Sequence, residues 1–267
     1  MHRSLFYYHR AQSKKPDTVR AALRSRVAEL HQKSRCAAGA RTLSRLLRNE
    51  GKDVGRYKAS RLMKEAGLVS KQPGKHSYRI REQVSGLAAN NLDRCFTVDA
   101  PNKVWCGDIT FIRTEAGWLY LAVVMDLYAR KIVGWAYSSE ANSELAKNAL
   151  AMAWQGRGCP EGVMFHSDQG TQYASLSYRT LAAKYGMMLS MSRSGNCWDN
   201  AVAERLFRSL KTEWVPRGGY RDRDEAADDI NQYLSGYYNR IRPHKNNGGL
   251  SPIDMERQKP LKYVQKS

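Results

Sequence analysis

The sequence has few of the features that anchor a chain in a membrane or cross-link it outside the cell. Its five cysteines stand at no spacing typical of a disulfide framework or a zinc site, so we expect them to be reduced. The longest apolar run, residues 118–125, is too short to cross a bilayer. The first ten residues lack the apolar stretch of a signal peptide. These absences argue against a membrane protein and predict a cytoplasmic one.

Acidic residues are also scarce, since 25 Asp and Glu face 44 Lys and Arg and the net charge is +19. A hydrophobic fraction of 42% is ordinary for a folded protein, so this excess does not indicate disorder. Residues 1–100 hold 22 basic and 8 acidic residues, which is +14 of the total. We therefore expect the first part of the chain to bind nucleic acid and the nearly balanced remainder to carry any chemistry.

Three short helices are expected in the first part, because apolar residues recur there at a helical period. A turn that contains glycine separates the second helix from the third. The third is basic and carries Arg56, Lys58 and Arg61, which is typical of a helix-turn-helix whose last helix enters the major groove. A plain helical bundle with a solvated basic face is the alternative. The expected helices are residues 19–32, 41–49 and 56–66.

After about residue 100 the pattern changes to strands. Three β-rich stretches joined by short polar turns predict consecutive antiparallel strands. Helices and short strands then alternate in the order βββαβαβα, which predicts a mixed sheet with helices packed on it. The expected strands are 104–112, 118–127, 131–137, 162–166 and 187–191, and the expected helices are 143–154, 175–184, 200–214 and 224–238, before a basic irregular tail.

This change of pattern predicts three parts: a helix-turn-helix domain over 17–75, a linker over 76–100 and a catalytic core over 101–262. The large aromatic residues of the sheet region are expected in the core rather than on the surface as platforms for DNA bases. These residues are Trp118, Tyr120, Trp135 and Trp154.

In two places an Asp is followed by a Glu 36 positions later, whereas roughly 0.5 such pairs is expected by chance. In one, Asp168 ends an expected strand and Glu204 opens a helix, while Asp108 adds an acid from the first strand. In the other, Asp108 pairs with Glu144, whose place in a first helical turn is explained by capping and the helix dipole. We expect Asp108, Asp168 and Glu204 to converge as ligands of Mg²⁺ or Mn²⁺ and Glu144 to take no part. His166 is expected to make local hydrogen bonds.

Helical geometry puts Glu204, Arg208 and Lys211 on one face of the expected helix and apolar residues on another. This face would hold a DNA phosphate beside a metal ion, and a solvated charged face is the alternative. A basic cluster near the end of the chain is also expected to contact phosphates, or else to solvate a loop. Its members are Arg240, Arg242 and His244.

Four stretches of the sequence form a distinctive set. They are Trp105-Cys106-Gly107-Asp108-Ile109-Thr110; His166-Ser167-Asp168-Gln169-Gly170; Gly195-Asn196-Cys197-Trp198-Asp199-Asn200-Ala201 with Glu204 and Leu210-Lys211; and Tyr238-Asn239-Arg240 with Arg242-Pro243-His244 and Leu250-Ser251-Pro252. In this order and spacing they resemble the integrase-core (OrfB) transposases of bacterial insertion sequences, over about residues 17–257. The family usually has a Tyr-Gly pair where this chain has Ala38-Gly39.

The resemblance implies an α/β fold, with a ribonuclease H-like mixed-sheet catalytic core preceded by a small all-α helix-turn-helix domain. It implies a DDE transposase, with Asp108, Asp168 and Glu204 as its triad, that nicks element ends and joins the 3′-hydroxyl to DNA with two Mg²⁺ or Mn²⁺ ions per site. Double-stranded DNA, further copies of the chain and an upstream-frame transposase subunit or fusion are the implied partners. A catalytically idle DNA-binding regulator and a nuclease without joining activity are the alternatives.

Overall fold

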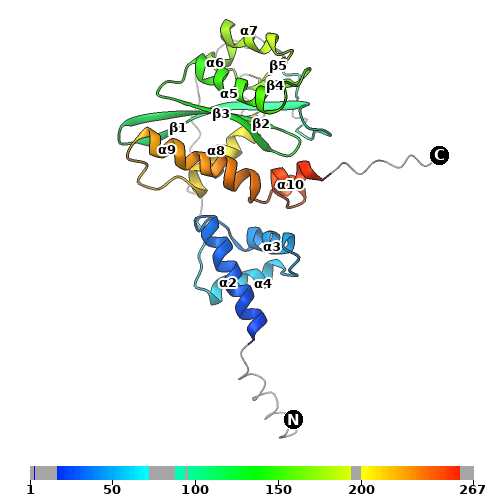
Figure 1. The fold of residues 1–267 in the computed structure, drawn as a ribbon, viewed down its shortest axis with the longest axis vertical. Helices are drawn as coiled ribbons and strands as arrows, with labels where there is room; N and C mark the ends of the chain where they lie inside the picture. The colour runs from blue at the N-terminus through cyan, green and yellow to red at the C-terminus, as the bar shows by residue number, and fades with distance from the viewer. Residues whose placement is uncertain (1–2, 4–16, 72–87, 94–95, 194–199, 259–267) are drawn as a thin grey trace, which may run out of the picture. The chain divides into compact units, whose positions relative to one another are not determined.

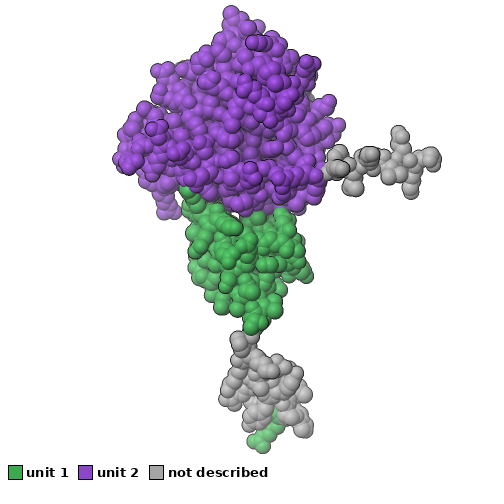
Figure 2. All heavy atoms as spheres, in the orientation of Figure 1, with its two compact units in different colours: residues 1–72 green, residues 73–267 purple. Residues whose placement is uncertain are grey.

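The computed structural model describes residue 3 and residues 17–71, 88–93, 96–193 and 200–258 (Figure 1). The chain divides into two compact units, Met1–Gln72 and Pro73–Ser267, which are coloured separately in Figure 2. No helix within the described ranges is long and apolar enough to span a membrane.

Within residues 17–71, the first unit has three helices around a small apolar core that includes Leu43, Leu47 and Leu62. Side-chain hydrogen bonds hold the helix ends and turns: Asp17 accepts the Arg20 N–H at 2.8 Å, and the Ser44 hydroxyl donates to the carbonyl of residue 54 at 2.7 Å. The three expected helices are confirmed, with ends that move by at most one residue. They are α2 (Thr18–Lys33), α3 (Ala40–Asn49) and α4 (Arg56–Glu65).

The second unit is built on a five-stranded sheet with the strand order β3-β2-β1-β4-β5. The first three strands form an antiparallel meander, and β4 and β5 run parallel to β1. This is the ribonuclease H-like mixed sheet that the sequence and its resemblance predicted. The strands are β1 (Val104–Thr114), β2 (Gly117–Asp126), β3 (Lys131–Ser138), β4 (Met164–Ser167) and β5 (Met188–Met191).

Helices cover both faces of this sheet and bury a separate apolar cluster on each (Figure 1). One face is covered by α5 (Ser143–Gly156), α6 (Thr171–Ala174) and α7 (Leu176–Lys184). The other is covered by α8 (Ala201–Glu213) and α9 (Arg223–Asn231). Residues 88–93, which fall in the range expected as a linker, also belong to this unit, since Leu92 is buried in its core.

The end of the chain is more regular than expected. The helix expected over 224–238 is α9 followed by a π-helical segment, η2 (Gln232–Tyr238). The expected irregular tail contains a 3₁₀ turn, η3 (Lys245–Asn247), and a helix, α10 (Pro252–Arg257). The Ser251 hydroxyl caps α10 by accepting the Asp254 N–H at 3.2 Å. The tail expectation was wrong because α10 is too short to show an apolar period.

The expectation for the aromatic residues is also corrected in part. Tyr120, Trp135 and Trp154 pack against the two apolar clusters. Trp118 is 46% exposed. Trp118 stands near the turn of the β1–β2 hairpin. The strand sequence is apolar there, but the Trp118 side chain is only partly covered.

Candidate active site

Asp108 lies in the middle of β1 and is 6% exposed. Its Oδ1 accepts the N–H of Ile109 at 2.7 Å. The residue before it must be glycine, because a Cβ on Gly107 would lie 2.5 Å from the Phe165 ring of β4. The Phe165 ring therefore lies over Gly107, just before the acid.

Asp168 follows β4 directly, and its Oδ1 accepts the Gly170 N–H at 3.0 Å. The parallel register pairs Cys106 with His166, so the same register continued for two residues sets Asp108 beside Asp168. Their charges act on one buried phenol: burial, then Tyr178, Asp108 and Asp168, raise the pKa of Tyr173 well above its ordinary value. These two acids from distant parts of the chain are thus neighbours at one sheet edge.

Glu204 lies in the first turn of α8 and is partly exposed. The buried side of this helix faces the apolar cluster that also contains Cys106 and Ile112 of β1. Asp108 shares the strand face of those two residues, so the structure places Glu204 on the helix that covers the face of Asp108. Within the described ranges, however, no three His, Cys, Asp or Glu side chains are grouped tightly enough to hold a metal ion.

Glu144 occupies a different environment. It is exposed in the first turn of α5, after the Asn142 cap that accepts the Leu145 N–H at 3.0 Å. Its carboxylate pairs with Lys147 at 2.6 Å. Because α5 covers the opposite face of the sheet from α8, Glu144 stands apart from the helix that carries Glu204.

His166 is buried between two serines at the end of β5. Its Nδ1 lies 3.0 Å from Ser190 Oγ, and its Nε2 lies 3.2 Å from Ser192 Oγ. Ser190 Oγ also accepts two backbone N–H groups from residues 91–92, which leaves its own hydrogen for Nδ1 and favours a neutral imidazole protonated on Nε2. The expected hydrogen-bonding role is confirmed, and it stiffens the strand end that leads into Asp168.

The expected DNA-contact residues of the first unit lie on the exposed surface of α4: Arg56, Lys58 and Arg61. The acid of this helix, Glu65, is bound through both oxygens by Arg20 of α2, at 3.1 and 3.2 Å from its Nε. Tyr57, which the sequence did not single out, is 81% exposed among these cations. The spacing of the buried Ala59, Leu62 and Met63 could have revealed it, since Tyr57 lies on the opposite side of the helix.

The expected DNA-contact residues of the second unit have different surroundings. Arg208 and Arg240 are exposed. The Lys211 Nζ lies 4.6 Å from the centroid of the Phe111 ring.

Arg242 and His244 instead have structural roles inside the unit. Arg242 donates to both carboxylate oxygens of Glu213, at 2.8 and 2.6 Å. Burial opposes the charge of Arg242, but these bonds outweigh it, so the pKa of its guanidinium is raised. His244 is buried edge-on against Tyr238, and burial lowers its pKa to about 3. Neither side chain is presented to a ligand in this structure.

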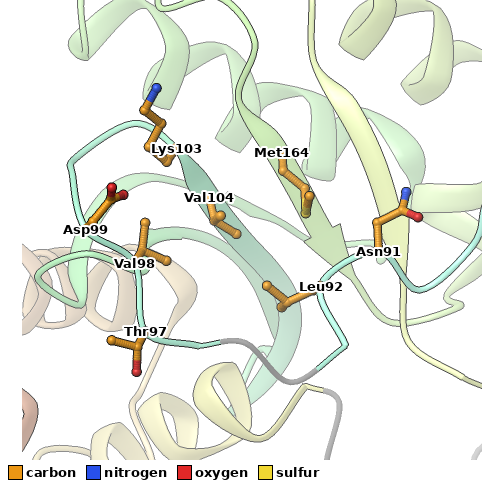
Figure 3. A pocket seen from close by; sticks show the side chains of 8 residues that line it. All are labelled: Asn91, Leu92, Thr97, Val98, Asp99, Lys103, Val104 and Met164. Atoms are coloured by element: carbon orange, nitrogen blue, oxygen red, sulfur yellow. The ribbon is translucent and has the colours of Figure 1, made fainter.

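A pocket of about 350 Å³ lies where β1 and β4 begin (Figure 3). It is lined by Val104 and Met164, which begin β1 and β4, and by Asp99 and Lys103. Asp108 and Asp168 lie toward the other ends of the same parallel strands. This pocket is therefore separate from the candidate active site.

Three family models match the chain. One described as an integrase core domain matches residues 98–197, and a second with that description matches residues 185–252. A model described as an HTH-like domain matches residues 18–76. Together with the mixed sheet, these matches define the class: a polynucleotidyl transferase core preceded by a helix-turn-helix domain.

The relatives narrow the class to a family. A 31 kDa protein of insertion element IS600 from Shigella sonnei is 38% identical over 91% of this chain and 89% of its own length. The transposase of insertion sequence IS904 from Lactococcus lactis is 34% identical over 93% and 98%. A solved structure of the HTLV-2 integrase catalytic core with magnesium is 18% identical over 58% and 97%, with a TM-score of 0.43. The chain belongs to the family of insertion-sequence transposases.

Proposed function

We propose that this transposase nicks the ends of its element and joins the freed 3′-hydroxyl to target DNA, with Asp108, Asp168 and Glu204 as its catalytic carboxylates. The observation that supports this assignment is the β1–β4 register, whose last pair, Cys106 with His166, lies two residues before Asp108 and Asp168. The position of Glu204 on the helix over β1 supports its inclusion as the third acid.

The donor set suits Mg²⁺ or Mn²⁺, because three carboxylates offer hard oxygen ligands and no sulfur. Two such ions, when bound, stabilise the attacking and leaving oxygens of the phosphodiester. Asp108, Asp168 and Glu204 would hold them, which requires the three side chains to close around the ions when metal and DNA bind. His166 and its serines would keep the Asp168 strand end in place during that closure.

Two groups of cations are proposed to hold the DNA. We propose that residues 17–75 are a helix-turn-helix domain that binds duplex DNA through Arg56, Lys58 and Arg61. The catalytic domain is proposed over residues 101–262, with residues 88–93 of the expected linker 76–100 packed onto it. A second group would contact phosphates near the carboxylates: Arg208, Lys211 and Arg240. Two of these, Arg208 and Lys211, share a helix face with Glu204. Arg242 and His244 are left out of this set because both have partners inside the unit.

Transposition also needs partners that hold two element ends and a target. We propose that copies of the chain assemble on the DNA and that a product of an upstream reading frame, separate or fused, completes the active complex. Neither partner is needed to form the apolar clusters of the sheet unit, which the chain buries by itself.

The experiment that tests this function uses labelled DNA carrying the ends of the encoding element, with Mg²⁺ or Mn²⁺. Nicked and joined products are scored with and without the upstream-frame product. Both products are expected in its presence. Binding without either product would favour a regulator, and nicking without joining would favour a nuclease. Calorimetry of Mn²⁺ binding to the wild type and to Asp168→Asn tests the metal ligands independently of activity. The variant should bind Mn²⁺ more weakly.

A further inference from the structure

Two aromatic side chains are exposed together on the β1–β2 hairpin: Phe111 is 39% and Trp118 is 46% exposed. The antiparallel register pairs Trp118 with Arg113, two residues after Phe111, so both rings lie on the same face of the hairpin. Their centroids are 5.1 Å apart and the ring planes meet at 83°. This edge-to-face contact fixes the orientation of one ring by the other and leaves apolar surface in water.

The backbone around Trp118 is held in place. Gly117 has a φ of +105°, and a Cβ there would lie 3.0 Å from the Arg223 guanidinium. The Arg223 Nε donates to the Trp118 carbonyl at 3.1 Å, and the Thr114 hydroxyl donates to the Gly117 carbonyl at 2.7 Å. The exposed position of Trp118 is thus a product of the fold and not of a loose turn.

A cation from the catalytic helix completes this cluster. Lys211 of α8 places its Nζ 4.6 Å from the centroid of the Phe111 ring, although α8 packs on the other face of the sheet. It can reach across the edge of β1 because β4 pairs with β1 from Val104 to Cys106 and then ends. Lys211 therefore connects the helix face of Glu204 with the exposed rings.

The cluster is also near the candidate catalytic residues along the same strand. Phe111 follows Asp108 by three residues, which is roughly 10 Å of extended strand. This odd separation puts the two side chains on opposite faces of the sheet, with Asp108 on the face that α8 covers and the rings on the face that α5 covers. A strand with its scissile phosphate at Asp108 would pass around the edge of β1, where Lys211 lies, to reach the rings.

We propose that Trp118, supported by Phe111 and Lys211, is a stacking site for an unpaired DNA base of the strand that carries the reacting phosphate. The proposal rests on the proposed role of Asp108. Aromatic rings combined with cations are typical of surfaces that bind single strands, because every base has a π face.

Three cations adjoin the rings: Lys211 at the Phe111 ring, Arg223 at the Trp118 carbonyl and Arg113 on the same strand face. The neighbouring acids Asp222 and Glu225 accept hydrogen bonds from Arg221, and Glu115 is exposed on the hairpin. The cations at the rings favour a polyanion over a second apolar protein surface.

The test uses the full chain and a forked DNA that carries 2-aminopurine at successive positions of its unpaired arm. Stacking on Trp118 should quench the fluorophore at one position near the fork. Trp118→Ala should lose this quench and bind the fork about tenfold more weakly. Trp118→Phe should keep most of the quench and most of the affinity for the fork, since it retains a ring. Leu176→Ala, which truncates a 75% exposed apolar residue on α7, is the matched control and should behave like wild type.

Each other outcome has a defined meaning. Unchanged quenching in Trp118→Ala would overturn the proposal. So would unchanged quenching accompanied by a shift of Trp118→Ala to a smaller species in sedimentation, since that would assign the rings to contact between copies of the chain. If the wild type quenches the fork at that position and cuts no element-end DNA with its partners present, the stacking site stands and the proposed function fails.

Discussion

The two units of this transposase use their charged side chains in different ways. In the helical unit, the cations of α4 are exposed, and the acid of that helix, Glu65, is bound by Arg20. In the sheet unit, some charged groups are turned inward, as shown by the buried Asp108 and by Arg242, which is bonded to Glu213, while others such as Arg208 and Arg240 are exposed. Outward cations act on any nearby phosphate, whereas inward charges act only on groups held at a fixed position.

This difference separates affinity from chemistry. Exposed cations release counterions from DNA, so the binding they provide is strong, salt-dependent and tolerant of single substitutions. A buried charge loses its hydration, so it persists only with partners that also fix its orientation. Changes in α4 are therefore expected to alter binding by degrees, and changes among the buried charges of the sheet unit to remove catalysis or stability outright.

The largest expected effect is the loss of catalysis in Asp168→Asn. The substitution removes a proposed metal ligand, and several kcal/mol of transition-state stabilisation corresponds to about a thousandfold or more in rate. DNA affinity should stay the same or rise, because one negative charge near the phosphates is removed. Nicking and joining assays, together with binding measured on the same DNA, check both parts.

Glu144→Gln is the matched control for Asp168→Asn. Glu144 is exposed and paired with Lys147. Replacing its carboxylate with the Gln amide should therefore leave both DNA cleavage and DNA affinity unchanged. Equal losses of activity in the two variants would remove the distinction between the acids, and with it the assignment of the chemistry to the edge beside α8.

The second largest effect is expected for Arg242→Met. This substitution removes the guanidinium from a mostly buried pair with Glu213, and breaking such a pair costs about 3 kcal/mol or more. Arg240→Met, at an exposed position nearby, should leave the free energy of unfolding unchanged and weaken DNA binding slightly. Urea unfolding of both variants checks this pair. Similar stability in both would mean that the sheet unit does not depend on its inward charges.

The sequence predicted the elements of both units because their signals are local. Apolar period and turn residues mark nearly all helices and strands to within a few residues. A local pattern also identified Asp168, because the end of the preceding strand can be read from the sequence. The short helix α10 escaped because six residues are too few to show a period.

Partners that are distant in the chain could not be predicted in this way. Arg242 looks like a phosphate ligand in a basic segment, and only the fold brings Glu213 to it. Trp118 belongs to an apolar strand, and its exposure depends on where the covering helices end. The serines that bind His166 lie 24 and 26 residues further along the chain. Each case turns on a tertiary contact that overrides the local pattern.

A smaller effect is expected within the outward charges of α4. Tyr57 and Arg61 lie opposite the buried side of the helix, so Arg61→Ala and Tyr57→Ala should reduce the preference for element-end over random DNA, by about 1 to 3 kcal/mol for a base contact. Arg56→Ala should weaken binding to both DNAs alike and lower the salt slope by about one. Competition binding at several salt concentrations separates the two behaviours. Equal binding of both DNAs by the wild type would favour a bundle with a solvated basic face.

The smallest effect concerns the pH dependence that an inward group imposes on stability. Burial, together with the charges of Arg242 and Arg130, lowers the pKa of His244 from 6.5 to about 3. Between these values the unfolded chain binds a proton that the folded chain does not, so the His244 contribution is present above pH 6.5 and is lost as the pH falls, by about 1.4 kcal/mol per pH unit. His244→Phe should remove this loss. Urea unfolding of both proteins between pH 7.5 and 5 isolates it, because the other titrating groups cancel in the difference. Parallel curves would mean that the pKa of His244 is the same in the folded and the unfolded chain.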